Sequence, residues 1–262
     1  MSTGEVGAAG LALSMVLVVA ALALSRWQHL RLERDLVVSV VRSVIQLLIV
    51  GAALKLVVDP GAWLGWSWLW VVGIVVFAAA TVARRAPELP GVFGIALAAN
   101  AASAAIGMAV TFGLGIFEVS GRTIVPVAGM LVGNAMKSGV VAGRRLVDAT
   151  AQQRAEIEAR LALGLPADAA ARPIVRATLR TAISPQIENT KALGFVFLPG
   201  AMTGLILAGV DPVQAVLTQG ALMYLILGGV VVTTAVTTLL AQRRLFTADH
   251  RLVPLARSTA DQ

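Results

Sequence analysis

Long apolar segments, each close to 20 residues, recur along most of this chain. A helix of about 20 apolar residues crosses the hydrocarbon core of a bilayer. Only 13% of the residues are charged, whereas soluble domains carry roughly 25%. The sequence therefore predicts an all-α, polytopic membrane protein that forms a single transmembrane domain over residues 1–262. Seven predicted spans cover about residues 8–25, 36–58, 63–83, 91–117, 123–143, 190–210 and 214–241.

The basic residues alternate from loop to loop, and this predicts the orientation of the spans. If the N-terminus lies outside, the outside loops hold only Arg122, because the other basic clusters then fall inside. The positive-inside rule favours this arrangement, with the C-terminus inside. The first apolar run follows an acidic segment, MSTGEVG, so we interpret it as a retained span rather than a secretory signal. The inside clusters contain Arg26, Arg31, Arg34, Arg84, Arg85, Arg144, Arg145, Arg154, Arg160, Arg172, Arg176, Arg180, Arg243, Arg244, Arg251 and Arg257.

Composition excludes several classes of function. The chain has no cysteine and two histidines, His29 and His250, both in polar flanks, so a thiol or histidine centre is not expected. The net charge of +7 comes from residues that flank apolar runs, which argues against a nucleic-acid partner. No G-x-x-x-x-G-K-[ST] loop occurs, so the chain carries no ATPase site of its own. We expect no catalytic residue and no metal or cofactor bound by this chain.

A few polar residues fall inside the predicted spans. Arg42 lies about two turns into the second span, with Gln46 one turn further on the same face. A charge at this depth is costly unless it faces protein or water. A functional role and a purely structural bond between helices both fit this pair. Lys137 lies deeper, and snorkelling to the inner surface is the simpler explanation for it.

Residues 144–189 form the one long inside segment, and they are rich in helix formers. Ile157, Leu161 and Leu165 recur at helical spacing and predict a short amphipathic helix. Gly164 and Pro166 break that helix before a second, basic helix. The segment could be a solvated linker, could lie on anionic lipid, or could dock a soluble partner through its apolar stripe; composition alone favours the linker.

Two spans are rich in glycine and proline. Gly129 with Gly133, and Gly200 with Gly204, have the G-x-x-x-G spacing that permits close helix approach. Pro199 followed by Gly200 predicts a kink or an unwound point. Packing in a dimer interface explains these features, and so does a translocation pathway lined by carbonyl, amide and thioether groups. The candidate pathway side chains are Met130, Asn134, Met136, Met202 and Gln219.

Several motifs together resemble the FetB-type iron-export permeases of bacteria, a family that includes plant membrane subunits linked to aluminium tolerance. The matching stretches are VVRSVIQLLIVGAALK at 40–55, IVPVAGMLVGNAM at 124–136, EARLALG at 158–164, and LPGAMTGLILAGVDPVQA at 198–215 with Gln219. The third resembles the EAA loop of ABC transporters, although the Leu-Pro expected after Ile174 is absent. Lys137 also departs from the family pattern.

The resemblance implies an ABC permease subunit that acts as a homodimer in the bacterial inner (plasma) membrane and exports iron or a related metal. A separate cytoplasmic ABC ATPase subunit would carry the ATP and Mg. An ABC permease for a non-metal cargo, of lipid or sugar-nucleotide type, and a stand-alone secondary carrier are the alternatives. The implied coupling residues are Glu156, Glu158, Ala159, Leu161 and Gly164, and the implied pathway or helix-break residues are Arg42, Gln46, Met130, Asn134, Met136, Pro199, Gly200, Met202 and Gln219.

Overall fold

The computed structural model describes residues 8–57, 63–194, 199–247, 249 and 251–253. Within these ranges the regular structure is helical, and an isolated bridge joins Phe246 and Leu252. The helices are α1 (Ala8–Trp27), α2 (Glu33–Val57), α3 (Leu64–Arg85), α4 (Val92–Gly113), α5 (Gly121–Gln152), α6 (Arg154–Ala162), α7 (Ala167–Lys191), α8 (Gly200–Leu207) and α9 (Pro212–Arg244).

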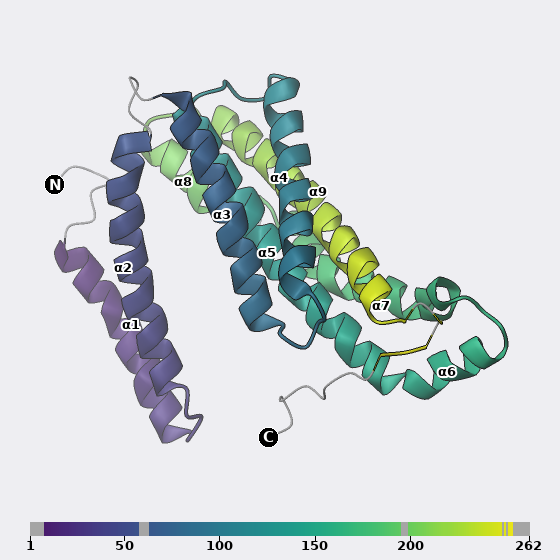
Figure 1. Ribbon diagram of the computed structural model, residues 1–262. Coiled ribbons are helices and arrows are strands. Elements are labelled where there is room, and N and C mark those ends of the chain that lie inside the picture. Colours follow the sequence, from purple (N-terminus) through teal and green to yellow (C-terminus); the bar gives the residue numbers. More distant parts are fainter. Residues whose placement is uncertain (1–7, 58–62, 195–198, 248, 250, 254–262) are drawn as a thin grey trace.

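Helices α3, α4, α5 and α9 pack side by side as a central bundle (Figure 1). Helix α7 packs against α5 and α9, and the short α8 lies on α9. Helices α1 and α2 form a hairpin beside α3 that stands apart from most of the bundle (Figure 1). The short helix α6 projects beyond the end of the bundle (Figure 1). The molecule therefore has a body of long helices and a small projecting part around α6, which we call the foot.

The prediction of an all-helical, polytopic membrane protein is confirmed. Five described helices, α2, α3, α4, α5 and α9, are long and apolar enough to cross a membrane, and Met15–Trp27 of α1 is a shorter apolar helix. The stretch predicted as the sixth span, 190–210, is not one helix in the described residues. Helix α7 ends at Lys191, Gly194 adopts a positive φ of 91°, and α8 begins after the extended Pro199. The count of seven spans and their orientation stay predictions.

Helix α5 extends past its predicted end, whereas α4 ends a few residues before its own. Helix α4 is continuous through Asn100 and Gly107, and the Asn100 side-chain amide donates to the carbonyl of Ala96 within the same helix (2.8 Å). Helix α5 continues to Gln152, so residues 144–152 extend a membrane helix instead of starting a separate segment. The strong helix formers there contain no breaker after Gly143.

The side chain of Leu131 packs between α4 and α9 where these helices meet α5. Leu131 of α5 is 1% exposed, and a Cβ added at Gly107 of α4 or at Gly229 of α9 would collide with its side chain. Ser103 of α4 donates a hydrogen bond to the carbonyl of Gly229 (3.0 Å) in the same contact. Close helix approach therefore occurs at these two glycines. The four predicted glycines lie at open positions, because an added Cβ would meet no described atom within 4 Å at Gly129, Gly133, Gly200 or Gly204.

We expect Gly229→Ala to lower the free energy of unfolding by about 1–3 kcal/mol, because the new methyl group overpacks against buried Leu131 and Ser103. Thermal unfolding of the purified protein in detergent measures this change. Gly228→Ala is the matched control, because its Cβ would meet no described atom within 4 Å. Equal melting temperatures for the two variants would contradict the packing described here.

Candidate functional site

Helix α6 and the turn after it form a compact foot at one end of the molecule. The turn closes with hydrogen bonds from the Gly164 amide to the carbonyl of Leu161 (2.9 Å) and from the Leu165 amide to that of Arg160 (3.2 Å). Gly164 has a φ of +85°, which a side chain would strain. Pro166 then caps α7 in an extended conformation. The predicted helix, break and second helix all occur in this segment.

The foot packs on a hydrophobic core that also includes Ile95 of α4. Ile157 of α6 is completely buried in it, together with Leu146 of α5, Ile174 of α7 and Leu245 at the end of α9. Leu161 packs at the edge of the same cluster. Helix α6 is thereby fixed to the ends of three long helices.

This burial corrects our prediction for the stripe of Ile157, Leu161 and Leu165. Docking of that stripe in a partner's groove was one of the three possibilities for this segment, but the stripe faces this chain's own foot, and Leu165 is the most exposed of the three. The opposite face of α6 is open instead. It presents Ala155, Ala159 and Ala162, all exposed, and ends at Leu163, which is 80% exposed. We call these four residues the alanine ridge.

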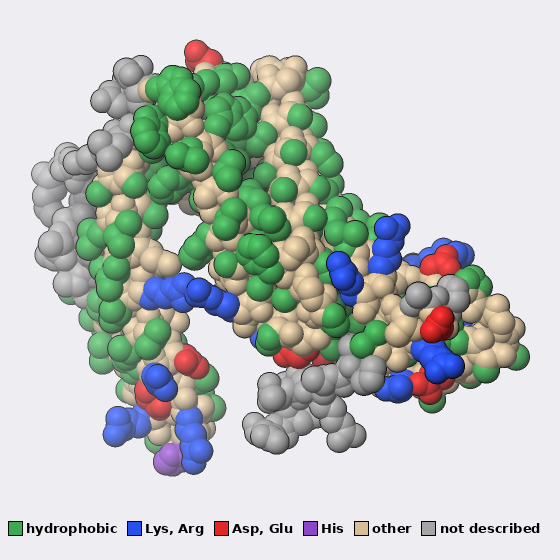
Figure 2. Space-filling view, in the orientation of Figure 1, with side chains coloured by type: hydrophobic (Ala, Val, Ile, Leu, Met, Phe, Trp, Pro, Cys, Tyr) green, Lys and Arg blue, Asp and Glu red, His purple; other side chains and the backbone are tan. Residues whose placement is uncertain are grey.

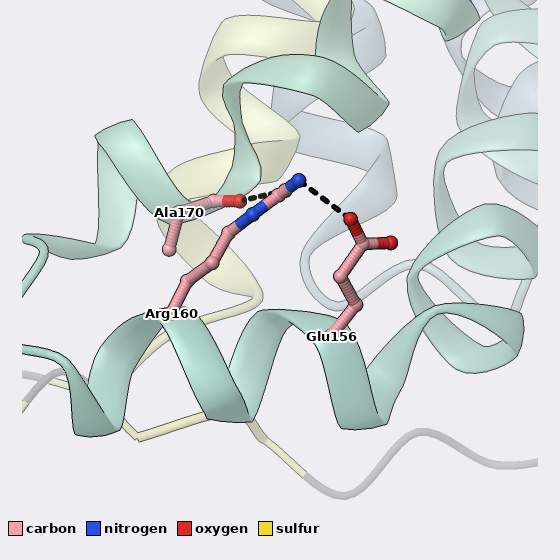
Figure 3. Close-up of polar contacts among 3 residues, drawn as sticks. All are labelled: Glu156, Arg160 and Ala170. Carbon is pink, nitrogen blue, oxygen red and sulfur yellow. Dashed lines mark hydrogen bonds and ion pairs between the residues drawn. The ribbon is translucent and has the colours of Figure 1, made fainter.

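Ion pairs flank the alanine ridge on both sides. Arg154 pairs with Glu158 (Nε to Oε1, 2.7 Å), and Arg160 pairs with Glu156 (Nη2 to Oε1, 2.6 Å). The second pair also joins two helices, because Arg160 donates through Nη1 to the carbonyl of Ala170 in α7 (3.1 Å; Figure 3). Both glutamates are about half exposed, so each remains accessible to a basic partner. These links hold α6 at a set angle to α7.

The C-terminal segment completes the foot, and the sequence analysis missed it. Val253 donates its amide proton to the carbonyl of Leu245 (2.9 Å), which turns the chain back and buries Leu252 in the foot core. Asp249 and Arg251 then border a cavity of about 660 Å³. Its other lining residues include Arg154, Glu158, Leu161 and Gly164. In the sequence, two apolar residues, Leu245 and Leu252, flank a short polar segment, and this pattern could have indicated that the chain folds back.

The predicted pathway residues of α5 diverge in the structure. Met130 packs against Met223 and Val230 of α9 and also against a cluster that contains Met108 of α4. Met136 packs against two other clusters, which α5 shares with α3 and α4. The Asn134 side chain donates to the carbonyl of Met130 (2.8 Å) within its own helix. Lys137 is exposed.

The predicted residues of α8 and α9 lie mostly inside the protein. Pro199 and Met202 are buried, whereas Gly200 is exposed. Gln219 is 4% exposed, and its Oε1 has no hydrogen-bond partner among the described residues. Burying an amide oxygen without a hydrogen-bond partner costs free energy. A polar group that reached this oxygen would remove that cost.

Arg42 and Gln46 lie away from these residues, on α2. Both are exposed in the single chain. In the described ranges, no group of three or more His, Cys, Asp or Glu side chains gathers closely enough to hold a metal ion. The predicted pathway set is therefore spread over the hairpin, α5, α8 and α9.

A buried polar seam between α4 and α9 was also missed. Thr233 donates to the carbonyl of Ala99 (3.4 Å), and the side-chain oxygens of Asn100, Thr234 and Thr237 are buried with no described partner. Small hydroxyl residues let membrane helices approach and bond. The pairs of threonines four residues apart in VTTAVTT, 232–238, were the available signal.

Comparisons with known proteins bear on the whole chain. A sequence profile described as an uncharacterised protein family, UPF0014, matches residues 8–246. The chain is 36% identical over 238 residues to the UPF0014 membrane protein STAR2 of Oryza sativa. This alignment covers 90% of the present chain and 82% of that protein. It is 32% identical over 255 residues to the "Probable iron export permease protein FetB" of Escherichia coli, covering 97% of both. It is 32% identical over 243 residues to the protein ALUMINUM SENSITIVE 3 of Arabidopsis thaliana, covering 92% and 88%. No solved structure matches the chain.

We expect Ile157→Ala to destabilise the foot by about 2–5 kcal/mol, because it empties a fully buried site. Limited proteolysis near Gly164 should become faster and the melting temperature should fall. Leu163→Ala removes a similar side chain from an exposed position and should change stability by less than about 0.5 kcal/mol. Equal proteolysis of the two variants would show that α6 is not anchored through Ile157.

Proposed function

Because this chain belongs to the UPF0014 membrane protein family, we propose that it is the membrane-spanning permease subunit of an ABC transporter. In this proposal it forms a homodimer in a bacterial inner membrane. A separate cytoplasmic ATPase subunit binds ATP and Mg and supplies the energy. The relative named as an iron export permease, similar over 97% of both chains, supports the transport role.

The single observation that carries the proposal is the alanine ridge on an anchored α6. Alanine side chains are short, so a partner's groove can approach the helix backbone of Ala155 and Ala159 closely. The half-exposed Glu156 and Glu158 border this face and favour a basic rim on the partner. The buried Ile157 transmits any push on α6 to α5, α7 and α9 through the foot core.

For the cargo, we propose iron or a related metal ion moved outward by alternating access. Closure of the ATPases on ATP would displace α6, and the connected helices would reorient around the pathway. The partnerless Oε1 of buried Gln219 supports a polar path beside α9. Carbonyl, amide and thioether groups bind metal ions more loosely than carboxylate clusters do, which suits release of a transported ion.

We expect Ala159→Trp to abolish co-purification with the partner ATPase, because the indole ring would prevent close approach to the alanine ridge. Ala177→Trp is the control, because Ala177 is also an exposed helical alanine but lies on α7. Pull-down of the tagged chain from membranes that also contain the ATPase measures the association. Unchanged association of the Ala159 variant would remove the docking role from α6.

Inverted membrane vesicles that contain the chain and its ATPase should accumulate labelled Fe²⁺ only when ATP is present. Gln219→Leu should reduce the initial rate about tenfold or more, since it removes the buried amide. ATP-driven uptake of an amphiphile without metal movement would replace the cargo with a lipid or sugar-nucleotide type. Uptake driven by an ion gradient without the ATPase would instead indicate a secondary carrier.

A further inference from the structure

An opening separates the α1–α2 hairpin from the bundle. The apolar span of α2 contains no buried residue, and Figure 2 shows a gap between α2 and the neighbouring helices, with basic side chains along its lower edge. At its upper end, α2 approaches α3. There, Ala53 and Val57 line an apolar cavity of about 670 Å³ with Trp66, Trp70 and Gly73 of α3.

A polar stripe lies on the same face of α2 as the two residues that line this cavity. Asp35, Ser39, Arg42 and Gln46 follow one another at intervals of four, three and four residues, so they lie on one face of the helix. Continuing from Gln46 by seven and eleven residues reaches Ala53 and Val57, which line the cavity. The polar stripe and the apolar cavity are therefore two parts of one groove.

The side chain of Arg42 has no ion pair or hydrogen bond within the described part of the chain. An arginine at membrane depth costs roughly 2.5–3.5 kcal/mol on insertion scales unless its charge is compensated. Side chains of a helix lean towards its N-terminus, so the guanidinium group points towards the Glu33 end of α2. The positive-inside rule assigns that end to the cytoplasm, where anionic lipids are enriched.

We propose that this groove binds a phospholipid with an anionic headgroup, taken from the inner leaflet. The headgroup contacts Arg42 and Gln46, and one acyl chain runs into the cavity beside Ala53, Trp70 and Gly73. The 11 residues from Arg42 to Ala53 span about 16 Å along the helix. This is close to the length of one acyl chain, because two opposed chains make up a hydrocarbon core of about 30 Å. Since Ala53 lies towards the outer end of the predicted span 36–58, the acyl chain would reach past the midplane of the bilayer.

The dimensions favour lipid over a second copy of the chain as the occupant. Helices α2 and α3 line one cavity together at the upper end, so its occupant lies between these two helices. A helix with its side chains is about 10–12 Å across. An acyl chain is much thinner, and the bound lipid would join the hairpin to the bundle. This site does not depend on the proposed transport function.

Native mass spectrometry of the purified full chain, titrated with phosphatidylglycerol or phosphatidylcholine, tests the headgroup. We expect retention of phosphatidylglycerol, and about tenfold weaker retention by Arg42→Gln. Arg34→Gln removes the same charge from the same helix but off the stripe, and should change retention less than about twofold. Equal retention of the two lipids by the wild type, or equal losses in the two variants, would overturn the proposal.

Filling the cavity tests the acyl chain independently of charge. A Cβ at Gly73 or at Gly94 would meet no described atom within 4 Å, so both positions tolerate a larger side chain, but only Gly73 lines the groove. Gly73→Leu should lower phosphatidylglycerol retention at least about fivefold, and Gly94→Leu should not. Because the chain has no cysteine, Ser39→Cys reports on a second copy: an interchain disulfide on mild oxidation would assign the groove to a dimer contact instead.

Discussion

The burial of Ile157 is the contact on which the rest of the foot depends. Ile157 lies in one buried cluster with residues of α5, α7 and the end of α9, and it helps to fix a helix of nine residues that would be only marginally stable alone. Arg160 adds directional bonds that set the angle between α6 and α7. A short helix held in this way suits the proposed coupling role, in which a force on its outer face would act on the long helices around the foot core.

The membrane body combines a tightly packed bundle with a loosely attached hairpin. Leu131 fills a notch made by Gly107 and Gly229, and hydroxyl groups bond across α4 and α9. In lipid there is little hydrophobic drive between helices, so such close packing and hydrogen bonding hold them together. Along most of α2, the hairpin has neither close packing nor hydrogen bonds to the bundle. It can therefore move relative to the bundle with the loss of few contacts between them.

These two parts suggest a division of roles. The bundle and the foot share α5 and α9, each more than 30 residues long, so movement at α6 reaches the membrane without an intervening joint. In the described residues of the α8 region, a helix of eight residues follows the extended Pro199. Gly200 and Gly204 lie open there, which leaves that surface free for a second protomer.

The sequence by itself determined the features that depend on local composition and spacing. Apolar length indicated membrane helices, and Gly164 with Pro166 marked the turn after α6, because a positive φ and a missing amide proton act on the backbone directly. Only the tertiary structure decided which faces meet. The stripe of Ile157 and Leu161 showed that one side of α6 would be buried, but periodicity carries no information about what covers it. The G-x-x-x-G spacings of Gly129 and Gly200 stay predictions of a dimer interface or a pathway, whereas the close contacts within one chain form at Gly107 and Gly229, where a leucine distant in sequence fits. The seam of threonines likewise arises from a pairing between α4 and α9, which are far apart in the chain, and no local pattern encodes it.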